Sequence, residues 1–194
     1  MLLLDYDPSS GEYLGSGCAK RAYSLSENVI IKISRSCLTD RQYKYLLAHK
    51  DSIHTIPIAS SEFRNCMGQE DSGAVVQTIS EWVIWEYAKK KKIKHVLCPI
   101  LSYGITRDRK VFTVMPRMYE CPEILYRYDK DYTSRRLSKD ERKFQVWFRL
   151  LSRTEKMFNL RDVTNHHGNY MVTEDLSHCY VVDYGCVVRP LPAI

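Results

Sequence analysis

Apolar residues in this chain gather in short runs separated by polar turns, a pattern typical of a sheet. The β-branched run Val29-Ile30-Ile31-Lys32-Ile33 follows Glu27-Asn28 and predicts a buried strand after a hairpin turn. Residues 95–104 and 110–116 predict two more strands, joined by a polar turn at 106–109. The first part of the chain is therefore expected to build a sheet.

Between these strands the pattern predicts two helices with a loop between them. Residues 41–48 form the first helix, and the polar stretch 60–73 is expected to be a flexible loop. Residues 75–94 form a longer helix, which Thr78 or Ser80 caps and a run of lysines ends. Lysines suit the negative end of the helix dipole, so a solvated helix end is favoured over a nucleic-acid patch.

The last part of the chain predicts a helix followed by two short strands. In residues 139–159, bulky apolar side chains recur at helical spacing, so this stripe is expected to pack in the core; it comprises Phe144, Trp147, Phe148, Leu151, Met157 and Phe158. The runs at 170–172 and 180–182 then form strands on either side of the polar turn 173–178. Strands and helices in this order give the fold class α+β.

Composition narrows the function only broadly. A chain of 194 residues with 44% hydrophobic and 27% charged residues is typical of a soluble domain with a real core. No signal peptide is expected, and no apolar stretch approaches the roughly 18 residues that span a bilayer. The seven cysteines are scattered, with no Cys-x-x-Cys pair, which indicates a reduced, cytoplasmic protein without a zinc site. The net charge of +6 favours acidic partners without choosing among them.

A glycine-containing turn precedes the first predicted hairpin. Gly15 and Gly17 flank Ser16, and such a Gly-x-Gly turn lets backbone N–H groups approach phosphate oxygens. Lys32 lies inside an apolar strand, where a lysine costs free energy unless an anion meets it. An ordinary turn with a lysine that points to solvent is the competing interpretation.

Polar residues also end the apolar runs near the C-terminus. Asp162, Asn169 and Asp183 each lie at the edge of such a run. Carboxylate and amide oxygens suit a hard cation such as Mg²⁺ or Mn²⁺. These three residues together are therefore candidates to hold a metal ion and to position a hydroxyl nucleophile.

Taken in order, these motifs resemble those of the protein-kinase-like fold. Residues 15–22 resemble its glycine-rich loop, with Lys20 in the place of the third glycine, and residues 29–32 resemble its Val-Ala-Ile-Lys strand. Residues 160–163 resemble the His-Arg-Asp-Leu catalytic loop, and residues 183–185 resemble the Asp-Phe-Gly loop. The Leu-Gly-x-Gly opening followed by Ala-Tyr is similar to that of small Ser/Thr kinases encoded by bacteriophages.

The resemblance implies a two-lobed protein. An antiparallel-sheet N-lobe would occupy residues 1–118 and a reduced C-lobe residues 119–194. Met115 and Met118 flank the link between the lobes, where the adenine of ATP would stack. Nine residues follow Gly185, so the substrate platform is expected to be reduced or supplied by a partner. Apolar faces left uncovered would favour a homodimer or a complex with a host protein.

The resemblance also implies roles for the N-lobe residues. Gly15 and Gly17 would cradle the phosphates of ATP. Lys32, paired with a helix glutamate, would fix the α- and β-phosphates. Glu81 is the first choice for that glutamate because it shares a helix face with an aromatic residue four positions later, and Glu86 is the second choice.

In the C-lobe, Asn169 and Asp183 would hold Mg²⁺ or Mn²⁺, and Asp162 would orient the attacking hydroxyl. Kinases place the Asn five residues after the Asp, whereas Asp162 precedes Asn169 by seven. Counting back five residues reaches Thr164. Either the loop holds two extra residues and Asp162 still reaches the site, or the base is lost.

These readings leave two leading hypotheses. The first is an ATP-dependent phosphotransferase with a protein Ser/Thr acceptor. The second is a pseudokinase that binds and modulates a host protein. Nucleic-acid binding rests on charge alone and is the least favoured. The expected location is the cytoplasm, that of the host if a phage encodes the protein.

Overall fold

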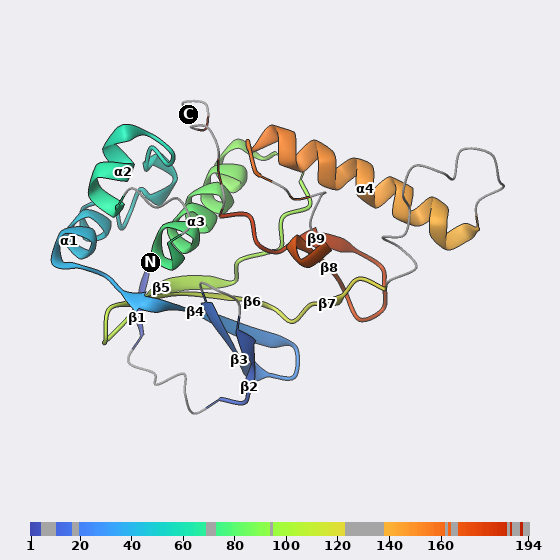
Figure 1. The fold of residues 1–194 in the computed structure, drawn as a ribbon, viewed down its shortest axis with the longest axis horizontal. Coiled ribbons are helices and arrows are strands. Elements are labelled where there is room, and N and C mark those ends of the chain that lie inside the picture. The colour runs from blue at the N-terminus through green and yellow to red at the C-terminus, as the bar shows by residue number, and fades with distance from the viewer. Residues whose placement is uncertain are drawn as a thin grey trace.

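The computed structural model describes residues 1–4, 11–16, 20–68, 73–93, 95–122, 138–161, 163, 167–185, 187 and 191. These residues form two sheets and four α-helices (Figure 1). The fold class is therefore α+β, as predicted. No helix in the described ranges is both long and apolar enough to cross a membrane.

The larger sheet has six strands in the order β1-β5-β6-β4-β3-β2. All neighbours are antiparallel except β1, which pairs in parallel with β5 at one edge. Its strands are β1 (Leu2–Leu4), β2 (Tyr13–Ser16), β3 (Lys20–Ser26), β4 (Val29–Cys37), β5 (Ser102–Thr106) and β6 (Lys110–Pro116). The β-branched run lies in β4, an inner strand, which explains its apolar character.

The helices of this half are α1 (Asp40–Ala48), the 3₁₀ turn η2 (Ile53–Thr55), α2 (Ser61–Met67) and α3 (Ala74–Lys91). Residues 69–72 lie outside the described residues, and the prediction of a loop over 60–73 was wrong for residues 61–67, which form α2. Its N-cap Ser60 accepts a hydrogen bond from the Phe63 backbone N–H at 3.1 Å. Phe63 and Met67, one helical turn apart, are both buried, which gives this short polar segment an apolar face.

Helix α3 covers one face of the larger sheet (Figure 1). Trp82 of α3 is fully buried, and its Nε1–H donates to the hydroxyl of Thr113 at 2.9 Å. Thr113 in β6 pairs with Lys32 in β4. Since residues paired across two strands point to the same face, Lys32 also lies on the face that α3 covers.

The start of α3 differs from the prediction. The helix begins after Gly73, whose position carries no side-chain cap. Thr78 and Ser80, the predicted caps, are buried within the helix, and the Thr78 hydroxyl donates to the Ala74 carbonyl at 2.8 Å. Bonding to the carbonyl four residues back satisfies a hydroxyl inside a helix, so a threonine does not have to mark the helix end. The lysines of the last turn are exposed, as expected.

The smaller sheet is antiparallel, in the order β7-β8-β9. Its elements are β7 (Tyr119–Glu120), the 3₁₀ turn η4 (His167–Asn169), β8 (Tyr170–Val172) and β9 (Cys179–Val181). The predicted lobe boundary after residue 118 falls in the short link from β6 to β7. One continuous core cluster nevertheless contains residues from both sheets.

The strand predicted over 95–104 begins only at Ser102. The preceding segment pairs instead with the smaller sheet: Cys98 N–H donates to the Val181 carbonyl at 2.8 Å, and Val181 N–H donates to the Val96 carbonyl at 2.7 Å. The backbone of an apolar run can form hydrogen bonds with a strand of either sheet, and the local sequence pattern does not determine which sheet it pairs with. This pairing ties β9 to the segment that follows α3.

Helix α4 (Lys139–Met157) lies against the smaller sheet and carries the predicted aromatic stripe. Phe144, Trp147 and Leu151 are buried, whereas Phe148 is 41% exposed and was wrongly assigned to the core. Its position one residue beyond Trp147 turns it about 100° away from the buried side. The hydroxyl of Thr154 accepts a hydrogen bond from the Val96 backbone N–H at 3.3 Å, which joins α4 to the same connecting segment.

Candidate functional site

Two lysines and two carboxylates from four segments meet beside α3. Lys20 begins β3, Lys32 lies within β4, Glu81 lies on α3, and Asp183 follows β9. The Lys20 ammonium donates to Glu81 Oε1 in a short ion pair and to Asp183 Oδ1 at 3.2 Å. Lys32 Nζ lies 3.9 Å from the same Asp183 oxygen. We call these four residues the charged cluster.

The register of β3 and β4 brings the two lysines to one face. Lys20 pairs with Ser34, and Ala22 pairs with Lys32. Because side chains alternate between the faces of a strand, Lys20 and Lys32 share the face that α3 covers. Lys20 is only 7% exposed, so its charge needs the two carboxylates that meet it.

The helix partner of this cluster is Glu81, the first choice from the sequence. Glu81 is 1% exposed, and its Oε2 has no hydrogen-bond partner among the described residues. Glu86 lies on the helix surface and pairs with Lys89 at 3.2 Å. The predicted pairing of Lys32 with Glu81 is corrected: Lys20 takes the bond to Glu81, and Lys32 lies beside Asp183. Lys20, which stands in place of the third glycine, is thus a site residue that the sequence motifs did not identify.

The predicted metal ligands Asn169 and Asp183 lie at neighbouring strand ends. Tyr170 pairs with Val181, and the Val182 N–H donates to the Asn169 carbonyl at 3.0 Å. The residue before β8 is thereby held next to the residues that follow β9. Within the described ranges, no three His, Cys, Asp or Glu side chains form a group that could hold a metal ion. Asn169 and Asp183 therefore offer an amide and a single carboxylate.

The two residues after Asp183 anchor its position. Tyr184 is fully buried, and its hydroxyl donates to the Cys98 carbonyl at 3.1 Å. Gly185 lies against α3, where an added Cβ would fall 2.2 Å from the Gln77 carbonyl oxygen. The segment that carries Asp183 is therefore packed against the helix that carries Glu81.

Burial and charge separate the pKa values of the two carboxyls. Burial is the largest influence on Glu81 and raises its pKa to about 7, although the charges of Lys20 and Lys32 oppose this. Burial also acts to raise the pKa of Asp183, but Lys20 and Lys32 hold that pKa well below its usual range. The Asp183 side chain is 49% exposed, so we attribute its lowered pKa to the lysines. At neutral pH Asp183 is the fully ionised member of the pair.

Lys20 stays protonated in this setting. Burial alone would lower its pKa, but the charges of Glu81 and Asp183 and their hydrogen bonds raise that pKa above its ordinary value. A permanently charged lysine between two carboxylates is a fixed link between α3 and the segment after β9.

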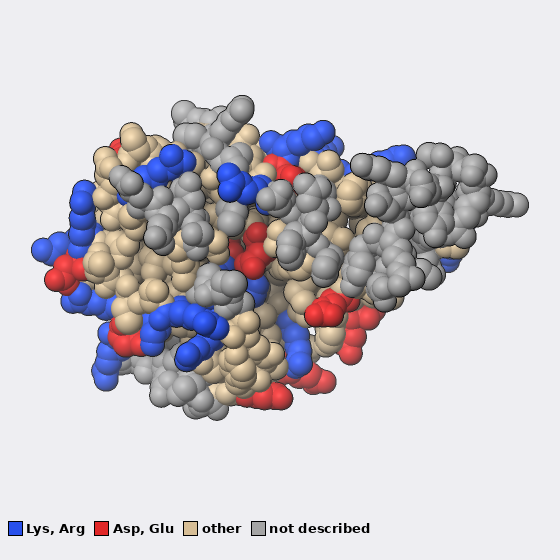
Figure 2. All heavy atoms as spheres, viewed as in Figure 1, with Lys and Arg blue, Asp and Glu red and all other residues tan. Residues whose placement is uncertain are grey.

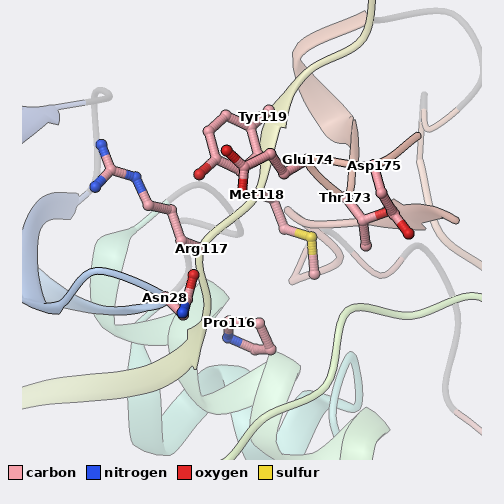
Figure 3. Close-up of a pocket in the computed structure, with 8 residues that line it drawn as sticks. All are labelled: Asn28, Pro116, Arg117, Met118, Tyr119, Thr173, Glu174 and Asp175. Carbon is pink, nitrogen blue, oxygen red and sulfur yellow. The ribbon is translucent and has the colours of Figure 1, made fainter. Parts of the chain in front are cut away.

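A cavity of about 510 Å³ lies beside the link between the two sheets, and none of the four residues of the charged cluster lines it (Figure 3). It is lined by the link 116–119, by Asn28 and by residues 173–175 of the β8–β9 turn. Met118 lines this cavity, whereas Met115 is 1% exposed in the core and does not. The two predicted adenine contacts are thus not brought to one cavity.

The remaining predicted residues are only partly placed. Gly15 lies in β2 with a φ of 151°, beside a register shift in its pairing with β3. Such a backbone favours glycine, so the choice of residue at this position has a structural reason. Gly17 and Asp162 lie outside the described residues.

On the face drawn in Figure 2, basic side chains are spread among acidic and neutral ones.

Comparison with known proteins gives little further information. No protein-family model and no curated protein matches the chain. Two solved structures resemble it: vaccinia related kinase 3, at 12% identity with a TM-score of 0.42, and WbdD with the kinase inhibitor LY294002, at 14% identity with a TM-score of 0.42. Both cover 90% of this chain, which spans 46% and 32% of their lengths respectively. At this similarity neither carries weight, and the function is inferred from the side chains themselves.

Proposed function

We propose that this protein is a kinase-like phosphotransferase that binds ATP with Mg²⁺ or Mn²⁺ at the charged cluster. The observation that carries the proposal is the meeting of four groups: a lysine from each of the neighbouring inner strands β3 and β4, a buried glutamate from the helix over those strands, and an aspartate that follows a strand of the second sheet. Four charged groups from four segments are costly to bring together in a fold without a use for them.

Lys32 binds the phosphates in this proposal. Its side chain is 17% exposed, and its Nζ stands 3.9 Å from Asp183 Oδ1, which is too far for a hydrogen bond. A phosphate oxygen can therefore approach Lys32 without displacing a bonded carboxylate. Because the Lys32 side chain is only 17% exposed, a charge-assisted contact with it is stronger than the same contact in bulk water.

Asp183 and Asn169 hold the cation. Asp183 would supply an ionised, half-exposed carboxylate, and Asn169, whose backbone carbonyl accepts from the Val182 N–H, would supply an amide oxygen from the neighbouring strand end. Mg²⁺ is commonly bound by one or two protein oxygens together with phosphates and water. Such a cation, when bound, neutralises charge on the phosphoryl group in transfer. The donor set thus fits the cation.

In the proposed reaction, the acceptor hydroxyl oxygen bonds to the γ-phosphorus while the bond to the bridging oxygen breaks and ADP leaves. Asp162 accepts the hydroxyl proton. Leu160 and Val163, which are near Asp162 in the chain, are buried, and Asp162 itself lies outside the described residues. The proposed acceptor is a Ser or Thr of a protein, in the manner of the small phage kinases that the motifs resemble.

A second candidate function is that of a pseudokinase that binds a host protein without transferring phosphate. The observation that favours it is the contact of Asp183 with two lysines, which compete with a cation for the same carboxylate. Nucleic-acid binding has no comparable support.

The test compares the wild type with Asp183→Asn and Lys32→Met, and with Lys89→Met as an exposed control. Binding of a fluorescent ATP analogue is measured with and without Mg²⁺, and transfer is followed with γ-labelled ATP. We expect both site variants to lose transfer by about tenfold or more. Transfer that Asp183→Asn leaves unchanged refutes the metal site. Binding without transfer favours the second candidate, and absence of binding refutes ATP as the ligand.

A further inference from the structure

The two lysines of the charged cluster differ in their surroundings. The Lys20 side chain is 8% exposed and is bonded to both Glu81 and Asp183. The Lys32 side chain is 17% exposed and stands beyond hydrogen-bond distance of Asp183. Lys20 thus hydrogen-bonds to two carboxylates, whereas Lys32 lies 3.9 Å from one of them and forms no hydrogen bond to it.

Glu81 depends on Lys20. Its Oε1 accepts the hydrogen bond from Lys20, its Oε2 has no partner in the part of the chain that the structure describes, and its side chain is 1% exposed. If Lys20 turned toward a phosphate, it would leave behind a buried carboxylate without a bonded cation. Removing one partner of a buried ion pair is strongly unfavourable, so this movement is opposed.

Lys20 also joins separate parts of the fold. It begins β3, Glu81 lies on α3, and Asp183 follows β9, so a single ammonium group bonds two other segments. The contact of Gly185 with the Gln77 backbone brings the same helix and the same segment together a second time. The position of Asp183 is therefore coupled to the position of α3.

We propose that the two lysines have different roles in the nucleotide site. Lys20 is a positioning residue that sets α3 and the Asp183 segment relative to each other, and Lys32 is the residue that contacts phosphate. This assignment rests on the proposed function for the role of Lys32, whereas the role of Lys20 rests on the ion pairs alone. Lys20 does not touch the substrate and acts through Glu81 and Asp183.

The experiment uses Lys20→Met, Lys20→Arg and Lys32→Met in the full chain, with Lys89→Met as the exposed control. The dissociation constant of the fluorescent ATP analogue with Mg²⁺ and the kcat of transfer separate binding from positioning. Hydrogen exchange of residues 74–91 and 183–185 reports how firmly the two segments are held.

For Lys20→Met we expect a change in dissociation constant below about threefold, a fall in kcat of about tenfold or more, and faster amide exchange in both segments. For Lys32→Met we expect a dissociation constant raised by about tenfold or more, with exchange unchanged. Lys20→Arg keeps the charge and restores slow exchange and most of kcat.

The division is overturned if Lys20→Met weakens nucleotide binding as much as Lys32→Met does, or if exchange in the two segments stays as slow as in the wild type. If Lys20→Met does not fold, the double variant Lys20→Met/Glu81→Gln tests the positioning role instead. In that variant the buried carboxylate is replaced by a neutral glutamine amide, which does not need a cation beside it. Recovery of folding in the double variant supports the positioning role, and its failure to recover contradicts that role. If the wild type binds no nucleotide, the proposed function is refuted. The hydrogen-exchange data would still show whether Lys20 holds α3 and the Asp183 segment in place.

Discussion

Gly185 and Gln77 are in such close contact that a Cβ on Gly185 would lie 2.2 Å from the Gln77 carbonyl oxygen. Real Cβ atoms do not approach backbone this closely, so either α3 or the segment after β9 would have to move. The glycine therefore sets the distance between the helix that carries Glu81 and the segment that carries Asp183.

Gly185→Ala is expected to lower the free energy of unfolding by about 1–3 kcal/mol, the usual cost of overpacking a filled site. Urea unfolding followed by circular dichroism measures this, with Ser36→Ala in an exposed part of β4 as the control. Nucleotide binding should weaken in parallel, because Asp183 moves with the displaced segment. An unchanged unfolding midpoint would show that the segment yields freely and that its position is not coupled to that of α3.

Thr113→Val tests the bond between α3 and the sheet. The buried indole N–H of Trp82 donates to the Thr113 hydroxyl, and valine has the same shape without an acceptor. An unsatisfied buried donor costs about 1–3 kcal/mol, so the free energy of unfolding should fall by that amount. Thr55→Val is the matched control at an exposed position, where the change should stay within about 0.5 kcal/mol. Equal effects of the two substitutions would count against this bond.

Tyr184→Phe tests the anchor of the Asp183 segment. The substitution removes the hydroxyl that donates to the Cys98 carbonyl but keeps the buried ring. We expect a loss of about 0.5–1.5 kcal/mol in the free energy of unfolding, the net worth of one hydrogen bond. Amide exchange at 183–185 should also become faster. Tyr180→Phe, at a partly buried tyrosine of β9, serves as the comparison. Slower exchange in Tyr184→Phe would contradict the anchoring role.

The pH dependence of stability follows from Glu81. Burial raises its pKa from the ordinary 4.5 to about 7 in the folded protein. Between these values the folded protein holds a proton that the unfolded chain gives up, so this contribution is complete below pH 4.5 and is lost as the pH rises toward 7. The lowered pKa of Asp183 and the raised pKa of Lys20 fall outside that window.

Wild type and Glu81→Gln should therefore differ in their pH profiles. Relative to the variant, the wild type is expected to lose stability as the pH rises through that window. Urea unfolding at a series of pH values measures the difference in unfolding free energy at each point. A difference that grows in favour of the wild type with rising pH would show that attraction to Lys20 outweighs burial at Glu81.

The sequence predicted most of the elements because hydrophobic period is a local property. The strand that carries Lys32 and the helix that carries Glu81 both lie close to where their apolar patterns predicted them. Helix α2 was missed because only Phe63 and Met67 mark its buried side within a polar stretch. The caps Thr78 and Ser80 were misplaced because a hydroxyl can be satisfied inside a helix as well as at its end.

The sequence by itself determined which groups are present and that several of them would be buried: a lysine in an apolar strand, a glutamate beside bulky helix residues, and an aspartate at the end of an apolar run. Only the tertiary structure decided that Lys20, and not Lys32, bonds to Glu81. From the sequence alone, either of two lysines on one face of adjacent strands could pair with the glutamate. Which of them reaches the glutamate depends on strand register and on where α3 crosses the sheet, and both are set by packing between distant segments.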